Sequence, residues 1–141
     1  MNVRLTHKDA QLPKRANPTD AGADLFSPVD VTIPARSRAF IDIGIQLELP
    51  RGTAGFIYAR SGLGTRQGLI PRNCVGVIDE AYRGNIGIML ENTGDQTVII
   101  NKGDRVAQLV VTKVEHPAFK FADTLTETDR GEDGFGSTGV K

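Results

Sequence analysis

Apolar and polar residues alternate strictly from Ile41 to Leu49, after Phe40. Every second residue from Ile41 to Leu49 is isoleucine or leucine, and the residues between them are Asp, Gly, Gln and Glu. A period of two over this length predicts a strand with one face in the core. Shorter apolar runs occur elsewhere in the chain, separated by turns rich in Gly, Pro, Asn and Asp. Short strands at regular spacing predict an all-β sandwich or barrel.

Residues 60–68, Arg-Ser-Gly-Leu-Gly-Thr-Arg-Gln-Gly, interrupt the strand pattern. Serine is a residue type that caps helices through its hydroxyl group, and glycine is the type that ends them in a left-handed conformation. We therefore predict one short helix near residues 61–67, with Ser61 as its cap and Gly68 as its end.

Residues 73–85 are predicted to form a β-hairpin. An apolar run from Cys74 to Ile78 is followed by a polar turn, and a second apolar run begins at Ile86. Asp79 stands at the end of the first run, where a carboxylate is costly unless it is solvated or used. With Tyr82 three residues further on, this segment has the residue types to hold a planar ligand.

The last stretch, residues 116–141, is polar and rich in glycine. Its large apolar side chains are Phe119, Phe121, Leu125 and Phe135. We predict a β domain over residues 1–115 and a flexible C-terminal arm over residues 116–141. Roughly 25 extended residues would span about 80 Å, enough to reach a neighbouring subunit.

Length and composition agree with one globular domain. A chain of 141 residues can bury a single core, and 16 Gly with 7 Pro favour β structure with many turns. The formal net charge is zero, so no overall field attracts nucleic acid or an anionic membrane, and any anion site has to be local. The single cysteine excludes an internal disulfide and suits a reducing cytosol, so we expect a cytoplasmic protein. No apolar run approaches the ~20 residues that span a bilayer.

Two segments contain residue types that bind phosphate. Arg60-Ser61-Gly62 at a helix start leaves backbone N–H groups free for an anion, although the same residues equally suit a simple capping turn. Residues 130–139 resemble a phosphate-binding loop in composition but lack the Gly-Lys-Ser/Thr of a Walker sequence. Taken alone, that second stretch suits a flexible tail better.

In combination and in this order, the motifs resemble those of the trimeric dUTP diphosphatase (dUTPase) family across essentially the whole chain. The five stretches that carry the resemblance are residues 21–25 (AGADL), 60–63 (RSGL), 76–84 (GVIDEAYRG), 103–109 (GDRVAQL) and 130–139 (RGEDGFGSTG). Agreement of five motifs at the family's spacing is not expected by chance.

The resemblance implies a β jelly-roll subunit of the β-clip type, assembled into a homotrimer with active sites at the subunit interfaces. The arm of one subunit would close over a site built by others. The implied reaction is hydrolysis of dUTP to dUMP and pyrophosphate, which keeps uracil out of DNA and supplies dUMP for thymidylate synthesis. The implied partners are dUTP and further copies of the chain, with no nucleic acid and no membrane, and a regulatory protein partner of unknown identity stays open.

The resemblance also assigns roles to the catalytic and phosphate-binding residues. Asp79 would hold and activate the water that attacks the α-phosphorus. Mg²⁺ would be held mainly by the triphosphate, with Asp24 touching it through water. The phosphates would be bound by Arg60, Ser61, Gly62, Gln108 and Arg130.

Recognition of the base and the sugar is implied for the segment around Gly76. Backbone groups of Gly76 and Val77, together with the Asn73 side chain, would pair with the uracil edge. The tight fit would exclude a 5-methyl group, and cytosine would leave polar groups mismatched. Tyr82 beneath the deoxyribose would clash with a ribose 2′-hydroxyl.

In the arm, Phe135 would stack over the uracil ring, and Gly136 and Ser137 would also contact the substrate. The chain departs from the family at Asp133, where the family usually has Gly. Asp tolerates positive φ better than most residues, but Glu132 and Asp133 would place two carboxylates near a polyphosphate. We therefore expect Asp133→Gly to lower the Michaelis constant.

Two other functions remain open at this point. A dCTP deaminase shares the implied fold, although the stretch Val-Ile-Asp-Glu-Ala-Tyr from Val77 to Tyr82 fits the diphosphatase pattern better. The other function is that of a jelly-roll module that binds nucleotide without catalysis and acts as a regulator. Release of ammonia or of pyrophosphate from dCTP and dUTP would separate these readings.

Overall fold

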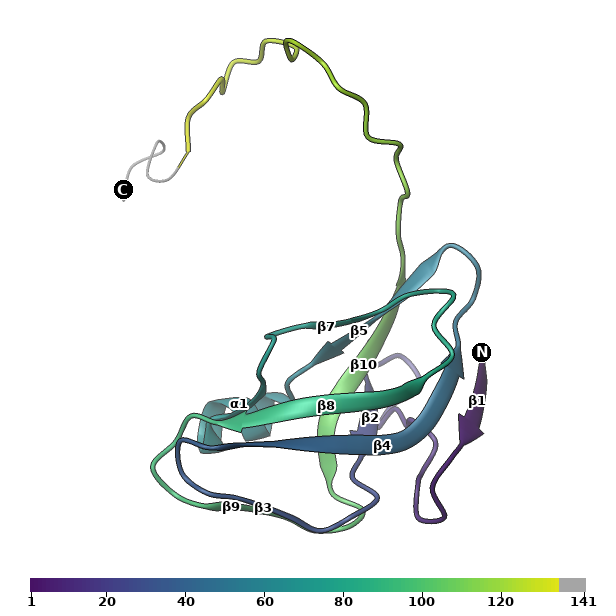
Figure 1. The fold of residues 1–141 in the computed structure, drawn as a ribbon, viewed down its shortest axis with the longest axis vertical. Helices are drawn as coiled ribbons and strands as arrows, with labels where there is room; N and C mark the ends of the chain where they lie inside the picture. Colours follow the sequence, from purple (N-terminus) through teal and green to yellow (C-terminus); the bar gives the residue numbers. More distant parts are fainter. Residues whose placement is uncertain (135–141) are drawn as a thin grey trace.

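Two four-stranded antiparallel sheets make up the body of the molecule (Figure 1). The computed structural model describes residues 1–134, which form ten strands and one helix. The elements are β1 (Asn2–Leu5), β2 (Ala23–Phe26), β3 (Val31–Ile33), β4 (Arg38–Glu48), β5 (Thr53–Tyr58), α1 (Ser61–Gln67), β6 (Leu69–Pro71), β7 (Gly76–Ile78), β8 (Asn85–Asn92), β9 (Val98–Ile100) and β10 (Arg105–Lys113). One sheet has the strand order β1-β4-β8-β6, the other has the order β2-β10-β5-β7, and β3 pairs with β9. The all-β prediction is confirmed.

The core contains side chains from both large sheets. Along β4 the predicted buried row is confirmed, since every second residue from Ile41 to Leu49 is 5% exposed or less. Gly44, predicted on the polar face, is also buried, at an irregularity where its φ is 71°. Its neighbour β8 follows the same pattern and buries Ile86, Ile88 and Leu90. The other sheet contributes Leu25, Ile57 and Leu109. Burying one such side chain fully is worth about 1.5–3 kcal/mol, so these rows hold the two sheets together.

The helix lies at the predicted position, but its cap differs from the prediction. α1 spans Ser61–Gln67 and ends at Gly68, which has a left-handed φ of 65° as expected. The residue at the N-cap is Arg60, with extended backbone and no side-chain capping hydrogen bond. Ser61 is the first helical residue, so the prediction that it caps the helix is wrong. A guanidinium has no acceptor atom, so Arg60 cannot cap the first N–H groups of α1, and its side chain pairs with Asp24.

The predicted hairpin over residues 73–85 is also wrong. β7 pairs with β5 in one sheet, whereas β8 pairs with β4 and β6 in the other. Residues 79–84 therefore cross from one sheet to the other. The crossing is attached to the body at Glu80, whose carboxylate accepts a hydrogen bond from the Gly52 N–H at 2.6 Å. An apolar run can pair with any strand, and here the two runs pair with different ones.

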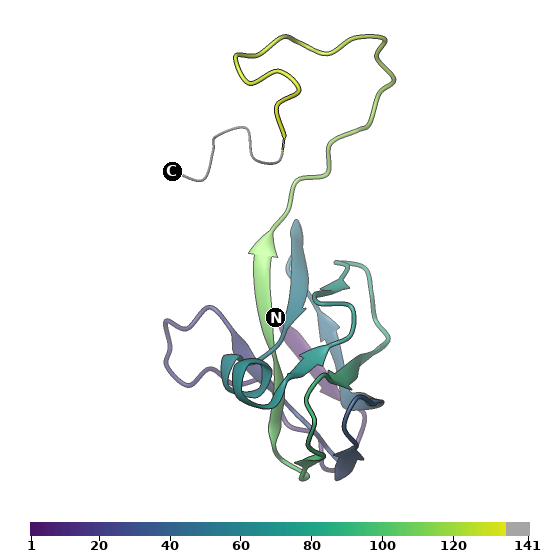
Figure 2. The same cartoon turned by 90° about the vertical axis from the view of Figure 1, so that its left-hand side faces the viewer.

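After β10 the chain leaves the two sheets, as Figure 1 and Figure 2 show. Residues 116–134 form no helix or strand, and their large apolar side chains are almost fully exposed. The exposed fractions are 98% for Phe119, 92% for Phe121 and 88% for Leu125. Phe135, Gly136 and Ser137, which were assigned to the substrate, lie outside the described residues. Within residues 1–134, no helix is long and apolar enough to cross a membrane.

Candidate active site

A hollow of about 390 Å³, here called the polar hollow, opens beside the start of α1. It is lined by Ala16, Asp20, Ala21, Gly22, Asp24, Arg60, Ser61, Arg105 and Gln108. Four of these, Asp24, Arg60, Ser61 and Gln108, were predicted as site residues from three separate motifs. Arg105 was not, although it belongs to the same motif as Gln108. Gly62 follows Ser61 in α1, with open space where a side chain would lie.

One carboxylate holds two guanidinium groups in the polar hollow. Arg60 Nε donates to Asp24 Oδ1 at 2.8 Å, and Arg105 Nη1 donates to Asp24 Oδ2 at 3.3 Å. The side chains of Asp24 and Arg60 are only 17% and 26% exposed, so solvent screens their ion pair less than it screens surface pairs. These two ion pairs hold the Arg60 guanidinium at the N-terminal end of α1.

Gln108 lies in the middle of the sheet, paired with Asp24 of β2 on one side and with Tyr58 of β5 on the other. Its amide Nε2 donates to the Ala59 carbonyl at 2.9 Å. A Cβ at Gly22 would lie 2.3 Å from Gln108 Oε1, so only glycine leaves room for this amide. The glycine of the first motif thus leaves the space that the glutamine of the fourth occupies.

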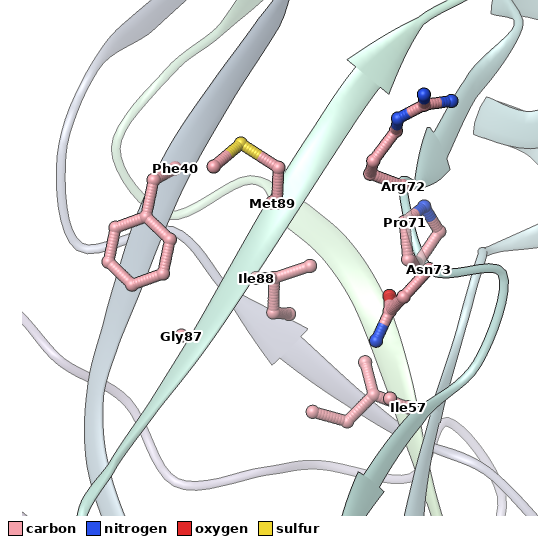
Figure 3. A pocket seen from close by; sticks show the side chains of 9 residues that line it. Phe40, Ile57, Pro71, Arg72, Asn73, Gly87, Ile88 and Met89 are labelled. Carbon is pink, nitrogen blue, oxygen red and sulfur yellow. The ribbon is translucent and has the colours of Figure 1, made fainter.

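A second hollow of about 750 Å³, here called the apolar hollow, lies beside β8 (Figure 3). It is lined by Phe40, Ile57, Pro71, Arg72, Asn73, Gly76, Gly87, Ile88 and Met89. Asn73 and Gly76 were predicted as site residues, and the Asn73 amide extends toward Ile57 in Figure 3. The other lining residues were missed, because apolar strand residues have no sequence signal that separates a pocket wall from core.

Two unpaired strand edges accompany the apolar hollow. Among residues 1–134, β7 is the last strand of its sheet and pairs only with β5. β8 pairs with β6 only from Leu90 to Asn92, so residues 86–89 have no strand partner on that side. The Met89 carbonyl accepts a hydrogen bond from the Arg72 N–H at 2.8 Å. The remaining backbone donors and acceptors of these edges are available to a planar, hydrogen-bonding ligand.

The crossing segment carries Asp79 and Tyr82, and both are exposed. The Tyr82 N–H donates to the Asp79 carbonyl at 3.0 Å, which closes a turn. The Tyr82 hydroxyl donates to the Asn85 carbonyl at 3.0 Å, and the side chain is 45% exposed. Tyr82 is therefore not a core tyrosine. Val77, predicted to contact the base through its backbone, is 59% exposed on the edge strand β7.

Within one chain, Asp79 lies far from the polar hollow. The antiparallel register pairs Gly55 with Ile78, which places Asp79 opposite Ala54. Arg60 is six residues further along the chain, or about 20 Å at ~3.3 Å per extended residue. The polar hollow and the apolar hollow also share no lining residue. A single subunit therefore does not bring Asp79 to Arg60 and Ser61.

The described part of the arm ends in a turn around Arg130. Arg130 Nε donates to the Asp133 carbonyl at 3.0 Å, and the Asp133 N–H donates to the Arg130 carbonyl at 3.1 Å. Gly131 has a φ of 53°, and Asp133 is not among the described residues with positive φ. The departure at Asp133 therefore needs no left-handed backbone in this conformation. Arg130 lines neither hollow.

The chain is similar to proteins named deoxyuridine 5'-triphosphate nucleotidohydrolase. The relative from Thermobifida fusca is 45% identical over 140 residues, which are 99% of this chain and 78% of that protein. The relative from Corynebacterium diphtheriae is 48% identical, over 98% of this chain and 91% of that protein. The Variola virus relative is 45% identical, over 99% of this chain and 92% of that protein.

The fold is similar to that of solved dUTPase structures. A dUTPase variant of Staphylococcus bacteriophage 80alpha with dUpNHpp matches with a TM-score of 0.91 at 30% identity, over 99% of this chain and 98% of that chain. A dUTPase variant of phage phi11 of S. aureus, described for its coordination of a structural Mg(II) ion, matches with a TM-score of 0.80 at 29% identity, over 87% of this chain and 96% of that chain. These matches agree with the jelly-roll fold that the motifs implied.

The dUTPase family itself matches residues 8–139, which include all five motifs and both hollows. The sequence motifs, the fold and the relatives therefore agree. This chain belongs to the dUTPase family.

Proposed function

We propose that this chain hydrolyses dUTP to dUMP and pyrophosphate, the activity for which its relatives are named. The observation that carries the proposal is the pair of hollows. One is polar and contains two arginines, which suits a polyphosphate; the other is apolar and accompanied by unpaired strand edges, which suits a planar base.

The polar hollow binds the phosphates. Ser61 and Gly62 supply backbone N–H groups at the start of α1, where the helix dipole favours anions. Arg60 supplies charge, and Gln108 keeps one amide hydrogen on Ala59 and has a second one for a phosphate oxygen. These groups are held by the protein before substrate arrives, so little reorganisation is needed as negative charge grows on the leaving pyrophosphate.

The apolar hollow binds uracil. The Asn73 side chain and the backbone of Gly76 and Val77 pair with the edge of the base, as a complementary base would. Cytosine would leave buried polar groups unpaired, a mismatch that can cost ~10⁴–10⁵ in selectivity. Tyr82 lies beneath the sugar, where it would clash with a ribose 2′-hydroxyl.

Asp79 acts as the general base on the attacking water, an effect usually worth ~10²–10⁴ in rate. Within residues 1–134 its side chain makes no ion pair and no hydrogen bond, in contrast to Asp24, which has two arginine partners. An exposed, unpaired carboxylate is free to accept the proton of a water molecule placed against the α-phosphorus.

Each complete site takes residues from more than one copy of the chain. Asp79 lies opposite Ala54, and the chain from Ala54 to Arg60 spans about 20 Å. This separation is too large for both residues to act on one α-phosphorus. A homotrimer with sites at its interfaces removes this separation, because the apolar hollow and Asp79 of one copy can meet the polar hollow of the next. The β domain of residues 1–115 forms the site, and the arm of residues 116–141 closes over it. The arm residues that contact the substrate are Arg130, Phe135, Gly136 and Ser137.

The oxygen donors of the polar hollow suit a Mg²⁺ ion that is bound mainly by the triphosphate of the substrate. No group of three His, Cys, Asp or Glu side chains within residues 1–134 is arranged to hold a metal ion. Mg²⁺ in nucleotide sites keeps several waters and binds one or two carboxylates together with phosphates. Asp24 lines the polar hollow and would hold the ion through water, and the ion would offset phosphate charge.

A substrate survey tests this function. The chain is incubated with Mg²⁺ and dUTP, dTTP, dCTP or UTP, and both pyrophosphate and ammonia are measured. We expect pyrophosphate from dUTP and little from the other nucleotides. Ammonia from dCTP would indicate a deaminase instead, and tight binding of dUTP without any product would indicate a regulator.

A mixing experiment tests the division of the site between copies. Arg60→Ala and Asp79→Asn chains are each expected to be nearly inactive, and sedimentation should show that both form trimers. When the two variants are unfolded and refolded together, mixed trimers should regain activity, because some sites then pair an intact Asp79 with an intact Arg60 from another chain. No recovery in trimers shown to be mixed would contradict the division.

A further inference from the structure

Arg105 lies in the polar hollow because β10 contains a bulge. Arg105 and Gln108 both line this hollow although they are three residues apart, and an odd spacing along a regular strand puts two side chains on opposite faces. The register with β2 shifts between Arg105 and Ala107: Arg105 pairs with Phe26, and Gln108 pairs with Asp24. Phe26 and Asp24 are two residues apart, so their partners share one face. One extra residue in β10 thus brings Arg105 beside Gln108.

The bulge also closes a ring of three residues. The Arg105 side chain donates to Asp24 Oδ2, Arg60 Nε donates to Asp24 Oδ1, and Arg60 Nη1 donates to the Arg105 carbonyl at 3.5 Å. Arg105 therefore contacts Arg60 directly through its backbone and indirectly through Asp24. Each member of the ring restrains the other two, so Arg105 limits where the Arg60 guanidinium can point.

The charge of this ring depends on Arg105. Asp24 and Arg60 by themselves form a neutral pair, and the second arginine leaves the three residues with a net positive charge. Asp20, the other carboxylate of the hollow, accepts a hydrogen bond from the Asn17 N–H at 2.8 Å. The Arg105 side chain is 50% exposed against 26% for Arg60, so its guanidinium is the more open of the two. With Asp20 counted, the two arginines and two carboxylates that line the polar hollow balance, so the hollow without Arg105 would carry a net negative charge that disfavours an anion.

We propose that Arg105 is a positioning residue of the phosphate site, which orients Arg60 through Asp24 and offsets the negative charge of the carboxylates that line the polar hollow. This inference rests on the proposed function, because it assumes that the polar hollow binds the polyphosphate of dUTP. It assigns Arg105 to binding of the phosphate chain and not to the base or to the water. Loss of Arg105 should therefore raise KM much more than it lowers kcat.

The test compares Arg105→Gln, Arg105→Lys and a matched control, Arg36→Gln. The control removes the same charge from an exposed ion pair with Asp95 that lies outside both hollows. Steady-state kinetics with dUTP are recorded at several salt concentrations, and calorimetry measures binding of inorganic pyrophosphate and of dUMP without metal. Thermal unfolding of each variant shows whether the fold is intact.

Arg105→Gln should raise KM for dUTP by about 10- to 100-fold, the range expected for a charge-assisted contact, and should flatten its salt dependence. Pyrophosphate binding should weaken in parallel, and dUMP binding should change less. Arg105→Lys should restore the salt dependence but only part of the affinity, because an ammonium lacks the planar fork of a guanidinium. Arg36→Gln should match the wild type.

Two results would overturn the inference. The first is a KM of Arg105→Gln within about twofold of the wild type. The second is an equal loss of pyrophosphate and dUMP binding with a lowered unfolding temperature, which would make Arg105 purely structural. Failure of the proposed function is distinguishable: the wild type would then release no pyrophosphate from dUTP, while pyrophosphate binding would still depend on Arg105.

Discussion

The polar hollow and the segment from Asn73 to Asn85 are stabilised in different ways. In the polar hollow, polar side chains hold one another: Asp24 binds two arginines, and Gln108 is anchored on a backbone carbonyl. In the segment 73–85, a strand of three residues pairs with one neighbour, and Asp79 and Tyr82 are exposed. The polar hollow is therefore organised by side-chain contacts within one chain, whereas Asp79 and Tyr82 in the segment 73–85 are open to solvent.

The polar hollow and the segment 73–85 should also differ in how they tolerate mutation. Exposed ion pairs such as Arg36–Asp95 are worth about 0–1 kcal/mol. The Asp24–Arg60 pair is mostly shielded from solvent, and removal of one partner would leave the other charge partly buried and unpaired. Changes in the polar hollow should therefore alter both the site and its surroundings, and changes at Asp79 should alter chemistry with little effect on folding.

The largest expected effect is that of Asp79→Asn. The amide cannot accept a proton from water, so kcat should fall by ~10²–10⁴. Because Asp79 is exposed, binding of dUTP and the unfolding temperature should stay close to wild type. Single-turnover kinetics and calorimetry with dUTP make the measurement. Intact hydrolysis by this variant would remove Asp79 from the mechanism.

Removal of the arm should have the next largest effect. A chain that stops after residue 129 lacks the whole fifth motif, so the closed site would be poorly positioned and open to water. Turnover of dUTP should drop on the order of 10²-fold, as for misplaced catalytic groups. A chain that lacks only Val140 and Lys141 is the matched control and should keep its activity. Equal turnover in the two truncated chains would mean that the arm does not serve the site.

Gly22→Ala tests the organisation of the polar hollow. The new Cβ would lie 2.3 Å from Gln108 Oε1, so the glutamine side chain has to move away from the hollow. KM for dUTP should rise about tenfold, the typical value of one lost hydrogen bond to a charged group. In the control Gly64→Ala, the added Cβ meets its nearest atoms at 3.6 Å and should stabilise α1 by about 0.5–1 kcal/mol. The hypothesis fails if both variants bind dUTP equally well.

The smallest expected effect belongs to the arm motif. Asp133→Gly removes a carboxylate that would approach the polyphosphate, so KM for dUTP should fall by a factor of about two to five, as for an exposed charge interaction. Asp123→Gly makes the same change in the arm outside the motif and should leave KM unchanged. A KM that is unchanged or raised in Asp133→Gly would show that this carboxylate is accommodated or useful.

The sequence by itself determined the family, the main strand and the helix. The alternation from Ile41 to Leu49 and the stretch Ser61–Gln67 with its final Gly68 are local features. Such features can be predicted because they depend on residues that are close together in the sequence. The motifs were readable for the same reason, since each places specific side chains at a fixed spacing. Asp24, Arg60, Ser61 and Gln108, which three of those motifs contribute, line one hollow.

Only the tertiary structure decided which strands pair and which side chains meet. The apolar runs on either side of Asp79 look like two arms of a hairpin, yet they pair with different sheets, because an apolar run does not encode its partner. Arg105 lies beside Gln108 because of a bulge that no period-two pattern predicts. The distance along β5 that separates Asp79 from Arg60 is likewise a consequence of register. Long-range pairing therefore set the geometry of the site, while the sequence pattern supplied its residues.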